Sequence, residues 1–167
     1  MAKTLPIPPG AHALTPNLSI HGATQAIEFY KRALDAAEKG RFPSPDGKAI
    51  WHAELRVGDS AVFLHDEMPM GPPAPTRDHP APVGFWIWVK DADAAFQRAV
   101  GAGASALMPP SDQFWGDRTA TVADPFGYAW TFATHVKDLT EEEMRRAGEE
   151  FARKSGMAAA DVKSSHA

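Results

Sequence analysis

A chain of 167 residues is long enough for one domain, or for two small fused modules, with a buried core. Its 44% hydrophobic and 23% charged residues are typical of a globular protein, and its formal net charge of −4 argues against nucleic acid or an anionic membrane as a partner. The absence of cysteine excludes disulfides, thiol nucleophiles and thiolate zinc sites. No stretch approaches the roughly 18 apolar residues of a membrane span, and the N-terminus lacks an apolar signal core, so we expect a cytoplasmic protein.

Two copies of a strand-to-helix pattern indicate an internal duplication. In the first copy, a short strand over residues 17–20 leads into a helix over residues 23–38, whose apolar residues recur at steps of three and four. We expect Gly40 to end this helix and a short strand to follow it. The second copy, residues 83–100, again reads as a strand, a charged break and a helix, the last over residues 91–102.

The clearest strand pair lies between these two copies. Residues 51–57 alternate between apolar and polar side chains, which is the pattern of a half-buried strand. A two-residue turn at Gly58 and Asp59 then leads into a returning strand, residues 60–66. With this turn three pairs share one side of the hairpin: His52 faces His65, Glu54 faces Phe63, and Arg56 faces Ala61.

The rest of the chain reads as a proline-rich linker, a second set of strands and a terminal helix. After the second helix, strands are expected near residues 105–108, 118–123 and 129–135, the last two joined by a turn. A capping box at Thr140 and Glu143 starts an amphipathic helix over residues 140–154, which docks on the body or on a partner chain. The expected parts are a flexible arm, a first βαβββ module, the linker, a second βαβββ module, the C-terminal helix and a disordered tail, at residues 1–13, 14–68, 69–82, 83–137, 138–155 and 156–167.

Two such modules resemble the vicinal oxygen chelate superfamily, which includes glyoxalases, bleomycin-resistance proteins and extradiol dioxygenases. The resemblance covers residues 14–138 and is carried by SIHGATQAIEFYKRAL, HAELRVGDSAVFLHDE and WGDRTATVADPFGYAWTFATH, which look most like the PhnB-like branch. It implies an α+β fold whose curved sheets form a half-open, barrel-like wall around a cavity, often completed in a homodimer. It also implies a divalent metal, held by His and Glu on the cavity faces of the sheets.

The metal ligands that the resemblance implies are largely missing from this sequence. Thr15 and Gly84 stand where metal-dependent glyoxalases have a histidine, and Thr131 stands where a glutamate would bind. A hydroxyl or a glycine is a poor replacement for an imidazole or a carboxylate. A fourth ligand falls within residues 63–66, where His65 or the next aspartate could still bind a cation. One remaining ligand does not hold a metal, so we expect neither a metal nor another cofactor, with a residual divalent metal as the alternative.

Three polar residues of the hairpin are the best candidates for catalysis. His52, Glu54 and His65 would share one face and could position a general base or hold a small cation. In the alternative interpretation this polar face is only exposed to solvent, and Glu54 accepts a hydrogen bond from His65.

Trp86 and Trp88 lie two residues apart on one strand, on the face of Gly84 that we expect to point into the cavity. Aromatic walls suit flat, apolar or cationic ligands. The alternative is that both indoles fill a dimer interface or plug the cavity.

A Trp-Gly-Asp-Arg stretch supplies two further candidates. Arg118 could bind an anion in the cavity and Trp115 could close its mouth, or Arg118 could brace the hairpin through Asp124. His135, at the end of the last strand, reads as a boundary residue. The residues expected to line the ligand cavity are Thr15, Asn17, Phe63, Trp86, Trp88, Trp115, Arg118 and Thr131.

These features predict a homodimer that binds a small organic, aromatic ligand in a cavity without a metal. The alternative is a glyoxalase-type lyase or isomerase that acts beside a carbonyl, with His52 or His65 as the base or with a residual metal. A third hypothesis is a regulatory protein that docks on a partner through the helix at residues 140–154.

Overall fold

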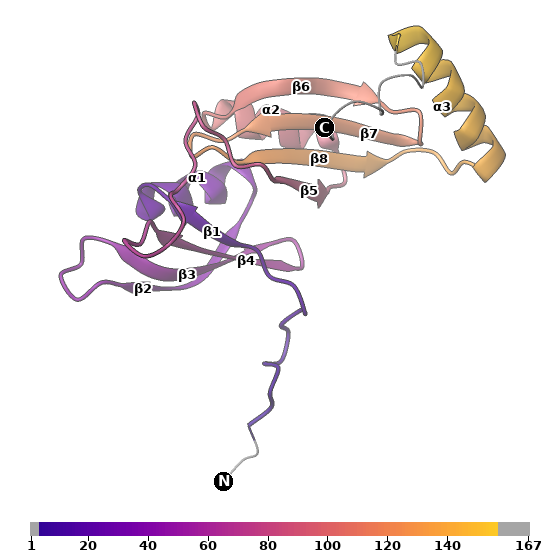
Figure 1. Ribbon diagram of the computed structural model, residues 1–167. Coiled ribbons are helices and arrows are strands. Elements are labelled where there is room, and N and C mark those ends of the chain that lie inside the picture. The colour runs from indigo at the N-terminus through magenta and orange to yellow at the C-terminus, as the bar shows by residue number, and fades with distance from the viewer. Residues whose placement is uncertain (1–3, 157–167) are drawn as a thin grey trace, which may run out of the picture.

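The computed structural model describes residues 4–156 of the chain (Figure 1). Apart from Gly156, the tail expected at residues 156–167 lies outside the described residues. The chain has an α+β fold of two βαβββ units followed by a helix, as the sequence predicts. The first unit comprises β1 (Asn17–Ile20), α1 (Ala23–Ala33), β2 (Ala37–Pro43), β3 (Ile50–Val57) and β4 (Ser60–Asp66). The second comprises β5 (Gly84–Trp88), α2 (Ala92–Gly101), β6 (Ser105–Asp112), β7 (Asp117–Ala123) and β8 (Ala129–His135), and α3 (Glu141–Ser155) follows it.

Each unit forms its own four-stranded sheet. Sheet 1 has the strand order β1-β4-β3-β2, and sheet 2 has the matching order β5-β8-β7-β6. In both, the first strand of the unit pairs in parallel with the last strand, and the other pairs are antiparallel. The identical order confirms that the two units are copies of one design, and neither sheet closes into a barrel on its own.

The register of the β3–β4 hairpin agrees with the prediction. Val57 lies opposite Ser60, and Glu54 lies opposite Phe63. The ladder ends where Ala53 pairs with Leu64, so the two candidate histidines lie one step beyond its last pair. Polar and apolar residues therefore separate onto the two faces of the sheet as the alternation indicates.

Helix α1 is shorter than its apolar pattern suggests. It ends at Ala33, where the amide of Leu34 bonds to the carbonyl of Tyr30, and Asp35 then adopts a left-handed backbone with φ of 55°. This turn sends the chain into β2 three residues before Gly40, so the prediction that this glycine ends the helix is wrong. The apolar periodicity of the sequence continues past Ala33 because the alanines that follow fit a strand as well as a helix.

The helices and the two sheets share one hydrophobic core. Helix α1 packs on sheet 1, α2 packs on sheet 2, and the two helices contact each other. Figure 1 shows α1 where the two sheets approach each other. Tyr30 of α1 also reaches sheet 2, where its ring lies 5.4 Å from that of Trp130. Each sheet thus has a face covered by helices, and we call the other its open face.

The start of α1 is fixed by a residue from β4. One oxygen of the Asp66 carboxylate accepts hydrogen bonds from the amides of Gly22 and Ala23, at 3.0 and 2.8 Å. The other oxygen accepts from the amide of Ile50 at 2.6 Å. Because Gly22 has no side chain to cap the helix, this distant carboxylate takes the role of the N-cap.

A second buried carboxylate joins the two units. Asp124, only 1% exposed, accepts hydrogen bonds from the hydroxyl of Tyr30 and the indole of Trp130, at 2.7 and 2.9 Å. The same carboxylate accepts from the amides of Phe126 and Tyr128, at 2.8 and 2.9 Å. Four donors satisfy the oxygens of this carboxylate, which is the condition for burying a charge.

The proline-rich segment between β4 and β5 contains no helix or strand, as predicted, and it is held by the β7–β8 turn. The amide of Ala81 bonds to the carbonyl of Gly127 at 2.9 Å. Gly127 has φ of 94°, and a Cβ atom there would lie 2.7–2.9 Å from backbone atoms of Thr76. The close approach of the two backbones therefore requires a glycine.

Helix α3 lies at the far end of sheet 2 (Figure 1). The predicted capping box is present: Thr140 accepts from the amide of Glu143, whose carboxylate accepts from the amide of Thr140. None of its residues is buried, and its aromatic contact is Phe151 against Phe114, with ring centroids 5.3 Å apart. Within residues 4–156, no helix is long and apolar enough to cross a membrane.

Candidate functional site

The open face of sheet 2 carries two exposed tryptophans. Trp86 and Trp88 of β5 are 48% and 62% exposed, and their ring centroids lie 5.9 Å apart. Trp86 lies beside Thr131 of β8, and Trp88 lies beside Ala133. Small side chains next to the indoles leave their faces accessible for contact with another molecule.

A groove of about 330 Å³ extends from these tryptophans to sheet 1. It lies between the edge strand β5 and the β3–β4 turn, and Leu14 of the N-terminal arm also lines it. A larger groove of about 790 Å³ lies beneath the proline-rich segment, along β1 and Tyr128. Both grooves are lined by residues of sheet 1 and of the edge strand β5 of sheet 2.

The open face of sheet 1 carries the predicted catalytic residues. The ring of His52 packs edge-on against that of Phe63, with centroids 4.8 Å apart. Nδ1 of His65 lies 2.8 Å from the carbonyl oxygen of Asp66. Within the described residues, no hydrogen bond joins Glu54 to either histidine. The strand places the three side chains on one face without assembling them into a bonded cluster.

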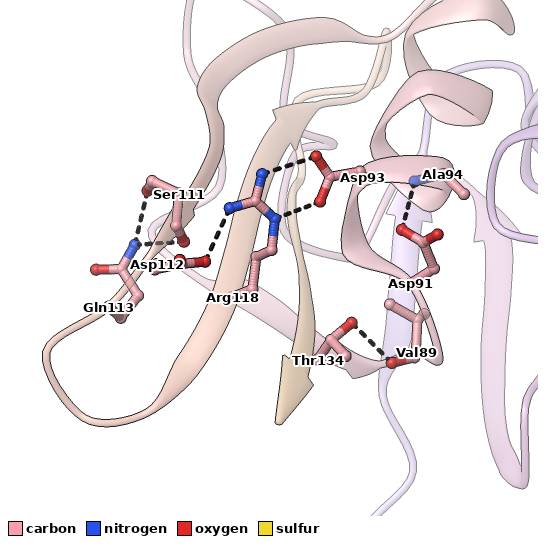
Figure 2. Close-up of polar contacts among 9 residues, drawn as sticks. All are labelled: Val89, Asp91, Asp93, Ala94, Ser111, Asp112, Gln113, Arg118 and Thr134. Carbon is pink, nitrogen blue, oxygen red and sulfur yellow. Dashed lines mark hydrogen bonds and ion pairs between the residues drawn. The ribbon is translucent and has the colours of Figure 1, made fainter. Parts of the chain in front are cut away.

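Arg118 lies on the helix-covered side of sheet 2 (Figure 2). Its guanidinium binds both carboxylate oxygens of Asp93 in α2 and one oxygen of Asp112 in β6, the last at 2.8 Å. These contacts raise the pKa of Arg118 and lower the pKa of Asp93. Arg118 thus braces the sheet against α2, and its partners are these two residues and not Asp124.

A histidine that the sequence analysis set aside lies at the end of the same open face as the tryptophans. His135 lies opposite Asp117 in the β7–β8 pair, and its Nδ1 is 2.8 Å from Oδ1 of that carboxylate. The indole of Trp115 donates to the other oxygen of Asp117 at 2.8 Å. Nε2 of His135 is 3.0 Å from the carboxylate of Asp138.

The two carboxylates differ in burial. Asp117 is only 7% exposed, whereas the side chain of Asp138 is fully exposed. Hydrogen bonds that the imidazole donates to Asp117 first, and then to Asp138, raise the pKa of His135. The expected strand at residues 118–123 begins one residue too late to include Asp117; extending it by one residue would have paired Asp117 with His135, which is the signal that the sequence contains.

Comparison with known proteins identifies the family. A sequence model of the glyoxalase/bleomycin resistance protein/dioxygenase superfamily matches residues 12–132. The chain belongs to this superfamily. An uncharacterized protein of Mycobacterium bovis is 43% identical over 139 residues, which cover 81% of this chain and 91% of that protein.

Two solved structures are similar to this chain in fold. TioX from Micromonospora sp. ML1 is 26% identical with a TM-score of 0.58, over 75% of this chain and 100% of that chain. A gene product of Arabidopsis thaliana is 28% identical with a TM-score of 0.59, over 74% of this chain and 98% of that chain.

The side chains at the positions that bind metal in metal-dependent glyoxalases do not fit a divalent ion in this chain. Gly84 offers no side chain, and the hydroxyl of Thr131 is 2.9 Å from that of Thr121. The Asp66 carboxylate is occupied by backbone amides, and Thr15 precedes β1 in the arm. Among residues 4–156, no group of three or more His, Asp or Glu side chains is arranged so that it could hold a metal ion.

The structure divides the predicted site residues between two surfaces. Asn17 lies beside Phe63 on the open face of sheet 1, while Trp86 lies beside Thr131 on that of sheet 2. Because α1 and α2 pack together on the covered faces, the two open faces do not face each other within one chain. Trp115 lies at the end of sheet 2, where its indole donates a hydrogen bond to Asp117. Its role in closing a cavity stays a prediction.

Proposed function

We propose that the protein binds a small aromatic molecule on the open face of sheet 2, in a cavity that a second copy of the chain completes. The observation that carries the proposal is the exposure of Trp86 and Trp88, side by side on a sheet face that none of the helices within residues 4–156 covers. Large exposed aromatic side chains that lie together mark binding surfaces more often than single exposed apolar residues do.

The open face of sheet 1 in the second copy would form the opposite wall. Within one chain it is turned away from the tryptophans, and it offers His52, Glu54 and the ring of Phe63 to a molecule bound there. The resemblance to glyoxalase-like proteins also implies a cavity completed by dimerisation. Such a site would combine an aromatic wall with a polar one, as small-molecule sites generally do.

The PhnB-like branch is the part of the superfamily that we propose for this chain, on the three sequence stretches that carry the resemblance. The misfit of Gly84, Thr131 and Asp66 to a metal supports ligand binding without metal chemistry. Metal analysis of the purified protein tests this point, and stoichiometric tight binding of zinc, nickel or manganese would overturn it.

Quenching of tryptophan fluorescence by a panel of small aromatic compounds tests the proposed site. Binding should weaken strongly in Trp86→Ala and Trp88→Ala. Trp51→Phe is the matched control, because Trp51 is 51% exposed but belongs to β3. If neither β5 variant changes any response, the proposal fails. Sedimentation at several concentrations measures the dimer separately, and a monomer at all of them would remove the second wall.

A further inference from the structure

We infer that the ligand of this site carries a carboxylate at one end, and that His135 binds it in the place now taken by Asp138. The inference rests on the proposed function and goes further by naming the class of ligand, an aromatic carboxylic acid. Three features of the structure carry it: how His135 is held, where it lies, and what occupies its outer nitrogen.

His135 is held firmly on its inner side. Its Nδ1 lies 2.8 Å from Asp117, whose other oxygen is bound by the indole of Trp115. The backbone beyond β8 is fixed as well, because the carbonyl of Gly116 accepts from the amides of Val136 and Lys137, both at 3.0 Å. A buried carboxylate that orients an imidazole in this way leaves Nε2 as its outward-facing group.

His135 lies within reach of a molecule stacked on Trp88. Trp88 pairs with Ala133, and His135 follows two residues later on the same strand and the same face. Strands about 4.8 Å apart, with a rise of about 3.3 Å per residue, place the two Cα atoms about 8 Å apart. A benzene ring with a short carboxylate arm spans such a distance.

A carboxylate already occupies Nε2. The carboxylate of Asp138 lies 3.0 Å from Nε2. Asp138 belongs to the segment that follows β8, and its side chain is fully exposed. An exposed ion pair of this kind contributes little, so a carboxylate brought by a bound ligand can replace it with the same charge-assisted geometry. Asp117 cannot be exchanged in this way because it is buried.

The charges at this end of the sheet suit an acid. His135 is the basic group that faces this end of the sheet, and its Nε2 becomes available to the ligand carboxylate once Asp138 has moved away. Lys90, an exposed residue, follows Trp88 by two positions just beyond the end of β5. It adds a second basic residue to the chain at this end of the strand.

Paired titrations of the whole protein with phenylacetate and phenylacetamide test the inference through tryptophan fluorescence. Both probes carry the same ring, and only one carries a charge. We expect phenylacetate to bind about tenfold more tightly, because a hydrogen bond to a charged group is stronger than one to a neutral group. His135→Leu should remove this difference, and His79→Ala in the proline-rich segment is the control that should keep it.

Asp138→Asn gives a second, independent measurement. This exposed residue can be changed without unfolding the protein, and the variant should bind phenylacetate more tightly while phenylacetamide binding stays the same. Equal binding of the two probes, or no effect of Asp138→Asn, would overturn the inference while leaving the aromatic site in place. If neither probe gives quenching that depends on Trp86 and Trp88, the proposed function fails, and this inference fails with it.

Discussion

The hydroxyl of Tyr30 donates a hydrogen bond of 2.7 Å to Asp124, and this contact joins the helix of the first unit to the last turn of the second. Both groups are buried in the shared core. Burial first, and then the charge of Asp124, raises the pKa of Tyr30 well above its usual value. The two units are thus connected by a buried polar contact, and the hydroxyl of Tyr128 adds a second one by donating to the carbonyl of Ser19 at 2.9 Å.

Loss of this contact should destabilise the whole chain. Tyr30→Phe removes one donor and should lower the free energy of unfolding by about 1–2 kcal/mol. Asp124→Ala should cost more, about 3 kcal/mol or above, since it leaves several buried donors without an acceptor. Urea unfolding measures both. Ser60→Ala is the control, because its hydrogen bond to Asp59 is exposed, and a Tyr30→Phe effect no larger than that of the control would contradict the prediction.

The distant cap of α1 gives a second prediction. Asp66→Ala leaves the amides of Gly22, Ala23 and Ile50 without their acceptor and should lower the free energy of unfolding by about 1–3 kcal/mol. Asp66→Asn keeps one acceptor oxygen and should cost less. Urea unfolding again measures the change, together with helix content by circular dichroism. Equal losses in the two variants would argue that the carboxyl group does not act as the cap.

The β8 end of sheet 2 should respond to pH through His135. Asp117 from β7 and Asp138 from the following segment face this imidazole and raise its pKa above the ordinary 6.5. A raised folded pKa means that the stabilisation is complete below the unfolded value and is lost as the pH rises through the folded value. Titration of the His135 ring protons by NMR measures the shift.

Asp117→Asn is the informative variant for that titration. It should move the pKa of His135 back towards its ordinary value and leave the titration of the other histidines as it is. If the pKa of His135 is unchanged in this variant, Asp117 does not stabilise the protonated imidazole.

Gly127 should control the proline-rich segment. Gly127→Ala places a Cβ against the backbone of Thr76, in a conformation that costs a non-glycine residue about 1–2 kcal/mol. The segment should detach, and trypsin should then cut faster after Arg77. Gly101→Ala is the control, since a Cβ there meets open space. The same cutting rate in both variants would show that the segment is not held by this turn.

The sequence predicted best what depends on local periodicity. Alternation over β3 and β4, with a two-residue turn, gave the hairpin register correctly because each residue has only two faces available. The end of α1 was missed because alanine-rich stretches fit helix and strand, and the left-handed Asp35 carries no strong signal. The two open sheet faces follow from the same alternation.

Partners distant in sequence were harder to predict. Of the two roles that the sequence allows for Arg118, bracing is the one found, but packing of α2 on sheet 2 brings Asp93 to it in place of the expected Asp124. Asp66 could not be identified as a helix cap because its partners lie more than forty residues away. His135 does end its strand, as the sequence predicts, but its contact with Asp117 depends on the pairing of β7 continuing to this last residue.

The position of α1 and α2 between the covered faces has a consequence for how the duplicated halves can change. A substitution on either open face contacts neither the shared core nor the other open face, so it can be accepted without a compensating change elsewhere. The present residues agree with such independent divergence: one copy of the module exposes His52 and Glu54, and the other exposes Trp86 and Trp88. The two copies of the module thus present two chemically different open faces.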